Sequence, residues 1–96
     1  MKKNIANLFK ALSDENRLLI FERLIQGETC GCTLLNNMPI TQPTLSYHLR
    51  LLSDSGLITA HKEGVWKKHH VDYEKLDALI DYLVSLKSMK GQCSND

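Results

Sequence analysis

The sequence predicts a mostly α-helical fold with one small β-hairpin, in the order α-α-α-α-β-β-α. Three observations lead to this prediction. Apolar residues recur at helical spacing along the first half of the chain, the pattern becomes strand-like after Gly56, and helical spacing returns after Asp72. Two of the expected helices are separated only by the break MPI at 38–40, which is a helix-turn-helix arrangement, and the hairpin that follows is a wing.

Size and composition limit the class of protein. Ninety-six residues, 43% hydrophobic and 24% charged, are typical of one globular domain. We expect residues 1–90 to form a DNA-binding domain with dimerising first and last helices, and residues 91–96 to be a flexible tail. A net charge of +1 is small for a nucleic-acid-binding protein, so any basic surface must be local, and a homodimer would double it.

Several functions are disfavoured by what the sequence lacks. No apolar run approaches the roughly 20 residues that span a bilayer, so no membrane partner is expected. Polar residues interrupt the N-terminal apolar stretch, which predicts a helix and not a signal peptide. We therefore expect a cytoplasmic protein whose three cysteines are reduced. The chain carries no nucleophile elbow, phosphate loop or HExxH motif, so we expect no enzyme.

The first two helices follow from apolar spacing and capping residues. A helix over 2–12 is predicted by residues at i, i+3, i+4 and i+7, which are Ile5, Leu8, Phe9 and Leu12. Ser13 is the expected N-cap of the second helix, with Asp14 and Glu15 in its first turn. Gly27 is expected to end that helix.

A short third helix over roughly 31–37 should stop before Pro39. The fourth helix, over 41–53, has Thr41 as its N-cap and Pro43 in its first turn. One face of this helix is an apolar stripe of three leucines, Leu45, Leu49 and Leu52.

The other faces of the 41–53 helix carry polar side chains and no carboxylate. Such side chains hydrogen-bond to base edges and phosphates, which suits a helix in a DNA major groove. An ordinary amphipathic surface helix has the same leucine stripe, so the neighbouring elements decide. The polar residues are Gln42, Thr44, Ser46, Tyr47, His48 and Arg50.

The segment after Gly56 predicts a hairpin. Residues 57–60 and 65–71 suit two strands, with Glu63-Gly64 as the turn. Lysines at 62, 67 and 68 are placed to contact phosphates, although lysine on an exposed hairpin also protects it from edge-to-edge pairing.

The last helix is expected over 73–90 with Asp72 as its N-cap. Its apolar surface is larger than a terminal helix of a small domain should expose to water, which predicts a helix–helix dimer interface shared with the first helix. The residues are Leu76, Leu79, Ile80, Leu83, Val84 and Leu86.

Four segments in this order resemble the ArsR/SmtB family of metalloregulatory repressors, in particular its arsenic-sensing branch. LSDENRLLIFERL (12–24) resembles the second-helix signature, TQPTLSYHLRLLSDSGLI (41–58) the recognition helix, KEGVWKKHHV (62–71) the wing, and TCGC (29–32) the cysteine segment. The resemblance covers about residues 5–88 and implies a homodimeric winged helix-turn-helix repressor that leaves its operator on binding a metal or metalloid.

The resemblance also assigns DNA contacts. Gln42 and Thr44 lie near the start of the recognition helix, where base-edge readers usually are, and Arg50 would bind guanine or phosphate. Ser46, Tyr47 and His48 would reach bases or phosphates, and Lys62, Lys67 and Lys68 would contact the DNA backbone from the wing. A two-fold dimer predicts an inverted-repeat operator with half-sites about one helical turn, or a multiple, apart.

Cys30 and Cys32 are the candidate metal ligands. Two residues at i, i+2 on a regular helix project about 200° apart, but at a fraying helix start they can converge, and Gly31 loosens the backbone there. Soft thiolates select thiophilic ions over hard, oxygen-seeking ones. The resemblance to the arsenic-sensing branch implies As(III) or Sb(III) as the inducer and no organic cofactor, while soft divalent ions remain open.

The arsenic-sensing pattern of the family is C-x-C-x-x-C, and here its third position is Leu35. Two completions are open. The third ligand is water or glutathione, or Cys93 folds back from the tail of the same or the partner subunit.

Three alternatives remain open at this stage. A redox-sensing repressor would use Cys30 and Cys32 as a thiol switch, although a C-x-C disulfide closes a small strained ring. A repressor without an inducer would leave both cysteines incidental. A dimeric interaction module without DNA binding would agree with the low net charge.

Overall fold

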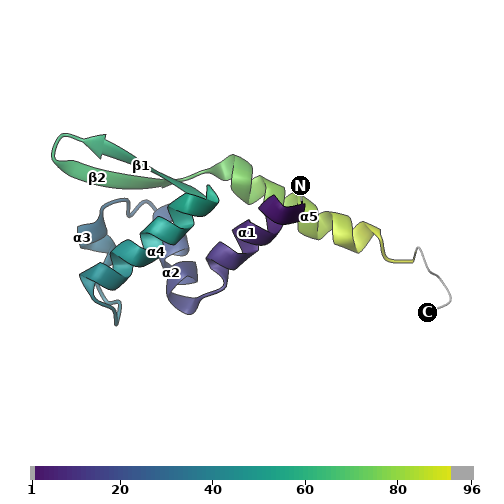
Figure 1. Cartoon of the computed structure of the whole chain (residues 1–96), viewed down its shortest axis with the longest axis horizontal. Helices are drawn as coiled ribbons and strands as arrows, with labels where there is room; N and C mark the ends of the chain where they lie inside the picture. Colours follow the sequence, from purple (N-terminus) through teal and green to yellow (C-terminus); the bar gives the residue numbers. More distant parts are fainter. Residues whose placement is uncertain (1, 92–96) are drawn as a thin grey trace.

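The computed structural model describes residues 2–91. Along these residues it has five helices and a two-stranded hairpin (Figure 1). The elements are α1 (Lys2–Leu12), α2 (Glu15–Ile25), α3 (Gly31–Leu34), α4 (Gln42–Ser55), β1 (Ile58–Glu63), β2 (Trp66–Val71) and α5 (Tyr73–Ser88). The predicted element order is confirmed, and solved structures with this winged helix-turn-helix fold are compared below.

The start of α2 differs from the prediction in one residue. Asp14, and not Ser13, is the N-cap, because its carboxylate accepts hydrogen bonds from the amides of Asn16 and Arg17 at 2.9 and 3.1 Å. The hydroxyl of Ser13 instead donates to the carbonyl of Lys10 at the end of α1. Asp14 therefore joins the helix start to the turn between α1 and α2.

Helix α3 is shorter than the expected 31–37. The guanidinium of Arg23 on α2 donates to the carbonyls of Leu34 and Asn36, and Asn37 has a left-handed backbone with φ of 62°. A left-handed residue cannot continue a right-handed helix, so the chain turns here. Helix α4 begins as predicted, since the Thr41 hydroxyl accepts from the amide of Thr44.

The hairpin formed by β1 and β2, here called the wing (residues 58–71), is antiparallel. Its register pairs Ile58 with Val71 at the base and Glu63 with Trp66 at the tip. The predicted turn at Glu63-Gly64 is wrong by one residue, because the two loop residues are Gly64 and Val65. Gly64 has φ of 65°, and glycine suits the first position of a two-residue hairpin turn with that backbone.

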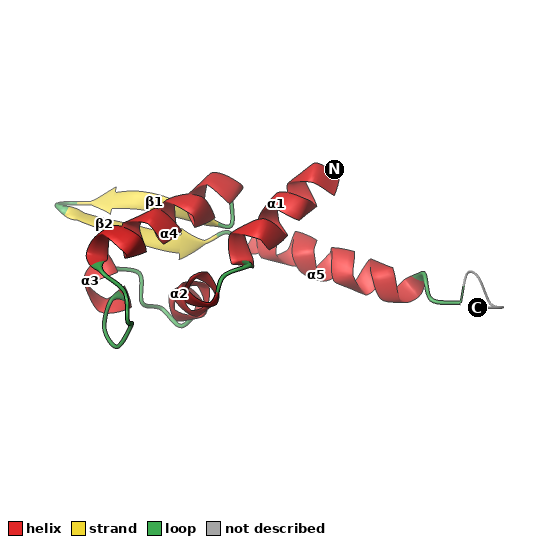
Figure 2. Cartoon of the chain, turned by 60° about the horizontal axis from the view of Figure 1, so that its bottom comes forward, coloured by secondary structure: helices red, strands yellow, loops and turns green. Residues whose placement is uncertain are grey.

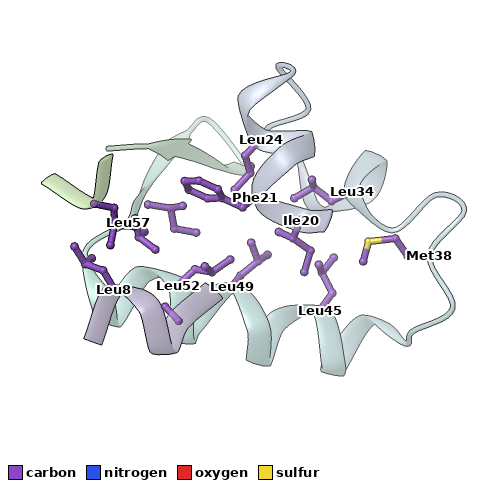
Figure 3. Close-up of a cluster of buried hydrophobic side chains, with 13 residues drawn as sticks. Leu8, Ile20, Phe21, Leu24, Leu34, Met38, Leu45, Leu49, Leu52 and Leu57 are labelled. Carbon is purple, nitrogen blue, oxygen red and sulfur yellow. The ribbon is translucent and has the colours of Figure 1, made fainter. Parts of the chain in front are cut away.

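The core lies between α4 and the elements packed on it. Figure 3 shows Leu45, Leu49 and Leu52 of α4 pointing toward side chains of α1, α2 and α3, as the leucine stripe predicts. The fully buried side chains that fill this layer are Ile20, Leu34, Leu52, Leu57 and Ile58.

Helix α5 follows the wing, lies against α1 and then extends beyond the other helices at its C-terminal end (Figures 1 and 2). The predicted cap is confirmed, since the Asp72 carboxylate accepts from the amides of Glu74 and Lys75. Most apolar side chains of α5 are exposed, among them Ile80, Leu83 and Val84. The radius of gyration is 16.0 Å, whereas a compact 100-residue domain has about 13 Å. No helix within residues 2–91 is long and apolar enough to span a bilayer.

The capping difference gives a stability prediction. Asp14→Ala is expected to lower the free energy of unfolding by about 1 kcal/mol, because two amides at the start of α2 lose their acceptor. Ser13→Ala is the matched control and should cost less than about 0.5 kcal/mol. Urea denaturation at one fixed protein concentration measures both, and equal losses would contradict the assignment.

The stability difference between wild type and Asp14→Ala is expected to depend on pH. The hydrogen bond from the Arg17 amide, more than any other cause, lowers the pKa of Asp14 below its ordinary 3.8. A carboxylate with a lowered folded pKa stabilises the fold above the unfolded value and loses this stabilisation as the pH falls through the folded value. The difference between wild type and Asp14→Ala should therefore shrink below about pH 4.

Candidate nucleic-acid interface and cysteine segment

A cleft of about 410 Å³ lies between α4 and the wing. Ser46 and Arg50 line it from α4, and Lys67 and His69 line it from β2. Figure 2 shows α4 and the hairpin lying alongside each other. The structure therefore brings together two groups of predicted DNA contacts that are separated in the sequence.

The wing places two lysines directly opposite each other. Lys62 on β1 pairs with Lys67 on β2 in the strand register, and both side chains are exposed. Like charges in this position repel. Among the described residues neither lysine has an ion pair within 4.0 Å, whereas Lys68 lies 3.4 Å from a carboxylate oxygen of Glu63. An anion bound between Lys62 and Lys67 would relieve the repulsion.

The exposed face of α4 carries most of the predicted base and phosphate contacts. Gln42 lies in its first turn and is exposed, while Thr44 is half-buried and its hydroxyl accepts a hydrogen bond from that of Thr41. The guanidinium carbon of Arg50 lies 5.8 Å from the ring centre of Tyr47, so a cation–π contact orients both side chains. These positions leave donors and acceptors free to face a groove.

His48 does not lie on that exposed face, which differs from the prediction. It is 7% exposed, and its Nδ1 lies 3.0 Å from a guanidinium nitrogen of Arg17 on α2. Arg17 also donates from Nε to the carbonyl of Ala11 at 2.7 Å. Because arginine has no acceptor, Nδ1 must accept, and His48 links α4 to α1 and α2 instead of to solvent.

The sequence predicts no role for Arg17 or His69, and it places His48 on the wrong face of α4. His48 lies three residues after Leu45 and four before Leu52, so its place on the leucine stripe was a signal that its side chain is buried. No comparable local signal exists for Arg17, whose partner is 31 residues away.

His69 is buried beneath the cleft. Burial first, and then the charge of Lys67, lowers the pKa of His69 below its ordinary 6.5, so the imidazole is neutral at pH 7. Its Nδ1 is buried, and within residues 2–91 no group hydrogen-bonds to it. His70, the next residue, lies on the opposite face of β2 and contacts the ring of His61.

The cysteine segment (residues 29–32) lies between α2 and α3 in the chain and pairs with β2. Cys30 is half-buried and is the N-cap of α3, with extended φ and ψ of −97° and 136°. It forms an antiparallel bridge with Lys68, and the amide of His69 donates to the carbonyl of Thr29 at 3.0 Å. Cys30 is thus outside the regular helix, so the 200° separation of an i, i+2 pair does not apply.

The other predicted ligands are only partly covered by the structure. The backbone of Cys32 is in α3, but its side chain, like the whole of Cys93, lies outside the described residues. Leu35, at the third position of the cysteine pattern, packs against the core. Among the side chains that are described, no three histidine, cysteine or acidic residues form a metal-binding group.

Comparison with known proteins finds relatives along most of the chain. The family model described as bacterial regulatory protein, arsR family, matches residues 14–60. An arsenical resistance operon repressor of Staphylococcus aureus is 35% identical over 91 residues, covering 95% of this chain and 88% of the relative. The one from Bacillus subtilis is 42% identical over 86 residues, with 88% and 82% covered.

A homologue of the cadmium resistance transcriptional regulatory protein CadC from Staphylococcus aureus is 37% identical over 79 residues. These residues are 81% of this chain and 65% of the homologue.

Solved structures share the fold. An ArsR-like transcriptional regulator from Rhodococcus sp. RHA1 superposes with a TM-score of 0.86 at 22% identity, over 98% of this chain and 89% of that one. A homodimeric winged helix-turn-helix DNA-binding domain from Mycobacterium bovis has a TM-score of 0.72 at 23% identity, over 94% and 84%. The fold is thus a winged helix-turn-helix.

The opposed lysines give a prediction that separates stability from binding. Lys62→Ala should leave the free protein as stable as wild type, or more stable by up to about 0.5 kcal/mol, because it removes a like-charge contact. It should also weaken binding to duplex DNA and lower the slope of log K against log salt by about 1. Lys3→Ala, in the first turn of α1, is the control and should change neither. A stability loss with unchanged DNA binding would show that Lys62 is structural.

Proposed function

The chain belongs to the ArsR family of bacterial regulatory proteins, and on this premise we propose that it is a homodimeric operator-binding repressor released by As(III) or Sb(III) at Cys30 and Cys32. Members of this family are DNA-binding transcriptional regulators and not enzymes. The observation that carries the proposal is the cleft in which Arg50 of α4 and Lys67 of the wing converge.

In the proposed complex, α4 reads the major groove and the wing holds the backbone. Gln42 and Thr44 contact base edges near the start of α4, and Ser46, Tyr47 and Arg50 contact bases or phosphates. Lys62, Lys67 and Lys68 contact phosphates. Because His48 is buried against Arg17, its role is to orient α4, and it is removed from the set of direct contacts.

The exposed apolar face of α5 supports the homodimer. Ile80, Leu83 and Val84 are each about half exposed, and Phe9 of α1 adds to the same region through its contact with Tyr82. A second copy would cover this surface and place two α4 helices on an inverted-repeat operator. Residues 1–90 form the DNA-binding and dimerising domain in this proposal, and 91–96 a tail.

The donor set at the cysteine segment fits a thiophilic ion in part. Two thiols supply two of the three sulfur ligands that pyramidal As(III) takes in the family pattern, and Leu35 cannot supply the third. Water, glutathione or Cys93 completes the set. The protein acts in the cytoplasm, where thiols stay reduced and operator DNA is present.

Binding of the inducer at Cys30 and Cys32 distorts α3, so the two α4 helices no longer match their half-sites. This is a coupling free energy and is therefore reciprocal, since DNA weakens inducer binding by the same factor. The similarity to both arsenical and cadmium resistance regulators makes Cd(II) the alternative inducer to test.

The inducer site is tested with Cys30→Ser/Cys32→Ser. Arsenite should release wild type from operator DNA and leave the double variant bound, because serine oxygens are poor ligands for a soft ion. Fluorescence anisotropy with labelled operator measures the release, with Cd(II) in a parallel titration. Equal release of both proteins would refute the site.

Two further measurements separate the alternatives. Native mass spectrometry of wild type and Cys93→Ser with As(III) tests the third ligand, since an unchanged stoichiometry and affinity removes Cys93. Thiol counts after mild peroxide test the redox alternative, which predicts loss of two thiols per chain and release without any metalloid.

The dimer is tested with Leu83→Glu/Val84→Glu. Two carboxylates on the exposed α5 face should give a folded monomer with strongly reduced operator affinity, because burying unpaired charges is unfavourable. Ser88→Glu adds a carboxylate to the side of the same helix that already carries Asp77 and Asp81, outside the apolar stripe, and should stay dimeric. Sedimentation velocity gives the mass, and a dimeric Leu83→Glu/Val84→Glu protein would contradict the interface.

A further inference from the structure

The cysteine segment is attached to the wing by one isolated β-bridge and one flanking hydrogen bond. The bridge of Cys30 with Lys68 and the hydrogen bond from the His69 amide to the Thr29 carbonyl attach it to β2. The carbonyl of Cys30 in turn accepts from the amides of Thr33 and Leu34, each at 3.0 Å. Cys30 therefore both pairs with β2 and caps the start of α3.

The far end of α3 is held by different elements. Leu34 is fully buried, and its carbonyl accepts from Arg23 of α2 at 2.9 Å. A displacement of Cys30 toward α3 is resisted by the packed core around Leu34. A displacement toward β2 meets a two-stranded hairpin whose tip is exposed to solvent. The hairpin is the softer of the two paths, because residues 59–67 are all exposed and no packed core resists a shift there.

The two faces of β2 connect this segment to the DNA side of the molecule. Facing residues of antiparallel strands put their side chains on one face, so Lys68 shares a face with Cys30. Lys67 and His69, which alternate with Lys68, line the cleft on the α4 side. A shift of β2 at Lys68 therefore moves Lys67 relative to Arg50.

We propose that the inducer acts through the wing: a ligand that joins Cys30 and Cys32 displaces β2 and withdraws Lys67 from the DNA backbone. This inference rests on the proposed function for the inducer site, and it replaces the route through α3 and α4 with a route through the wing. Gly31, between the two cysteines, is the residue at which the backbone changes conformation most easily, since it has no Cβ. A Cβ at Gly31 would meet nothing within 4 Å, so no other part of the described chain packs closely on this side of the residue.

The displacement acts on a strained arrangement. Lys62 and Lys67 are held opposite each other by the register of β1 and β2, and they repel unless an anion lies between them. Loosening β2 lets the two charges separate, so the site for a phosphate is lost together with the strand pairing. The leucine stripe of α4 stays buried throughout, and the reading helix keeps its orientation in the protomer.

The test compares a wing contact with an α4 contact. Operator affinity with and without arsenite is measured at low salt for wild type, Lys67→Ala and Gln42→Ala, each as the full chain. Both variants should bind more weakly than wild type. Regulatory couplings are typically about 5–150-fold; the arsenite-induced loss should fall at least about threefold in Lys67→Ala and stay within about twofold of wild type in Gln42→Ala.

A second measurement follows the hydrogen bond itself. Arsenite should accelerate hydrogen exchange of the His69 amide in the DNA-free protein and leave it unchanged in Cys30→Ser/Cys32→Ser. If Lys67→Ala keeps the full arsenite response, or if the His69 amide keeps its protection, the wing route is wrong. The proposed function then stands as long as wild type is still released and the double variant is not. If arsenite releases neither protein, the proposed function fails and this inference fails with it.

Discussion

The burial of the α4 leucine stripe is the constraint on which the other features depend. Leu45, Leu49 and Leu52 are packed beneath α1 and α2, and each buried leucine contributes about 1.5–3 kcal/mol. Rotating α4 about its axis would expose all three leucines at a cost of about 4.5–9 kcal/mol. Regulatory coupling free energies are typically about 1–3 kcal/mol, which is less than this cost. The stripe therefore determines which side chains face outward, and regulation must act on what surrounds α4.

Much of this arrangement is readable from the sequence, because it depends on local spacing. The bounds of α1 follow from its apolar spacing, and the caps at Thr41 and Asp72 follow from residue types at the helix starts. The errors at α2 and at His48 occur where a side chain bonds to a different helix. Ser13, the predicted cap, donates back to the Lys10 carbonyl of α1, and Asp14 takes the cap position of α2.

His48 is the clearest case of a residue whose position local spacing does not determine. A polar residue on an apolar stripe is buried only if a partner satisfies it, and that partner, Arg17, belongs to another helix. The bridge between Cys30 and Lys68 is a similar case, since one pair of residues leaves no periodic signal. Both contacts join segments more than 30 residues apart, and both bear on how the reading surface is held.

Electrostatics explains how a chain of net charge +1 can present a DNA surface. The wing concentrates Lys62 and Lys67 on one face, at the cost of repulsion in the free protein, while Glu63 neutralises Lys68 on the other. Because Lys62 and Lys67 repel each other, the proposed phosphate contact would stabilise the wing, and the wing without phosphate would be displaced easily. A stiff, well-compensated hairpin would bind phosphate without being responsive to a neighbouring segment.

Dimerisation turns a small local change into a large one. In the proposed homodimer each wing contributes separately to one operator, so the free-energy losses of the two protomers add. A loss of about tenfold at each wing becomes about a hundredfold for the complex, which lies within the range of known couplings. In the proposed homodimer the exposed α5 face joins the two protomers, so the losses at both wings act on one piece of DNA. The proposed site, with two thiols and a third ligand from outside the segment, would therefore control an operator without reorganising the core of either protomer.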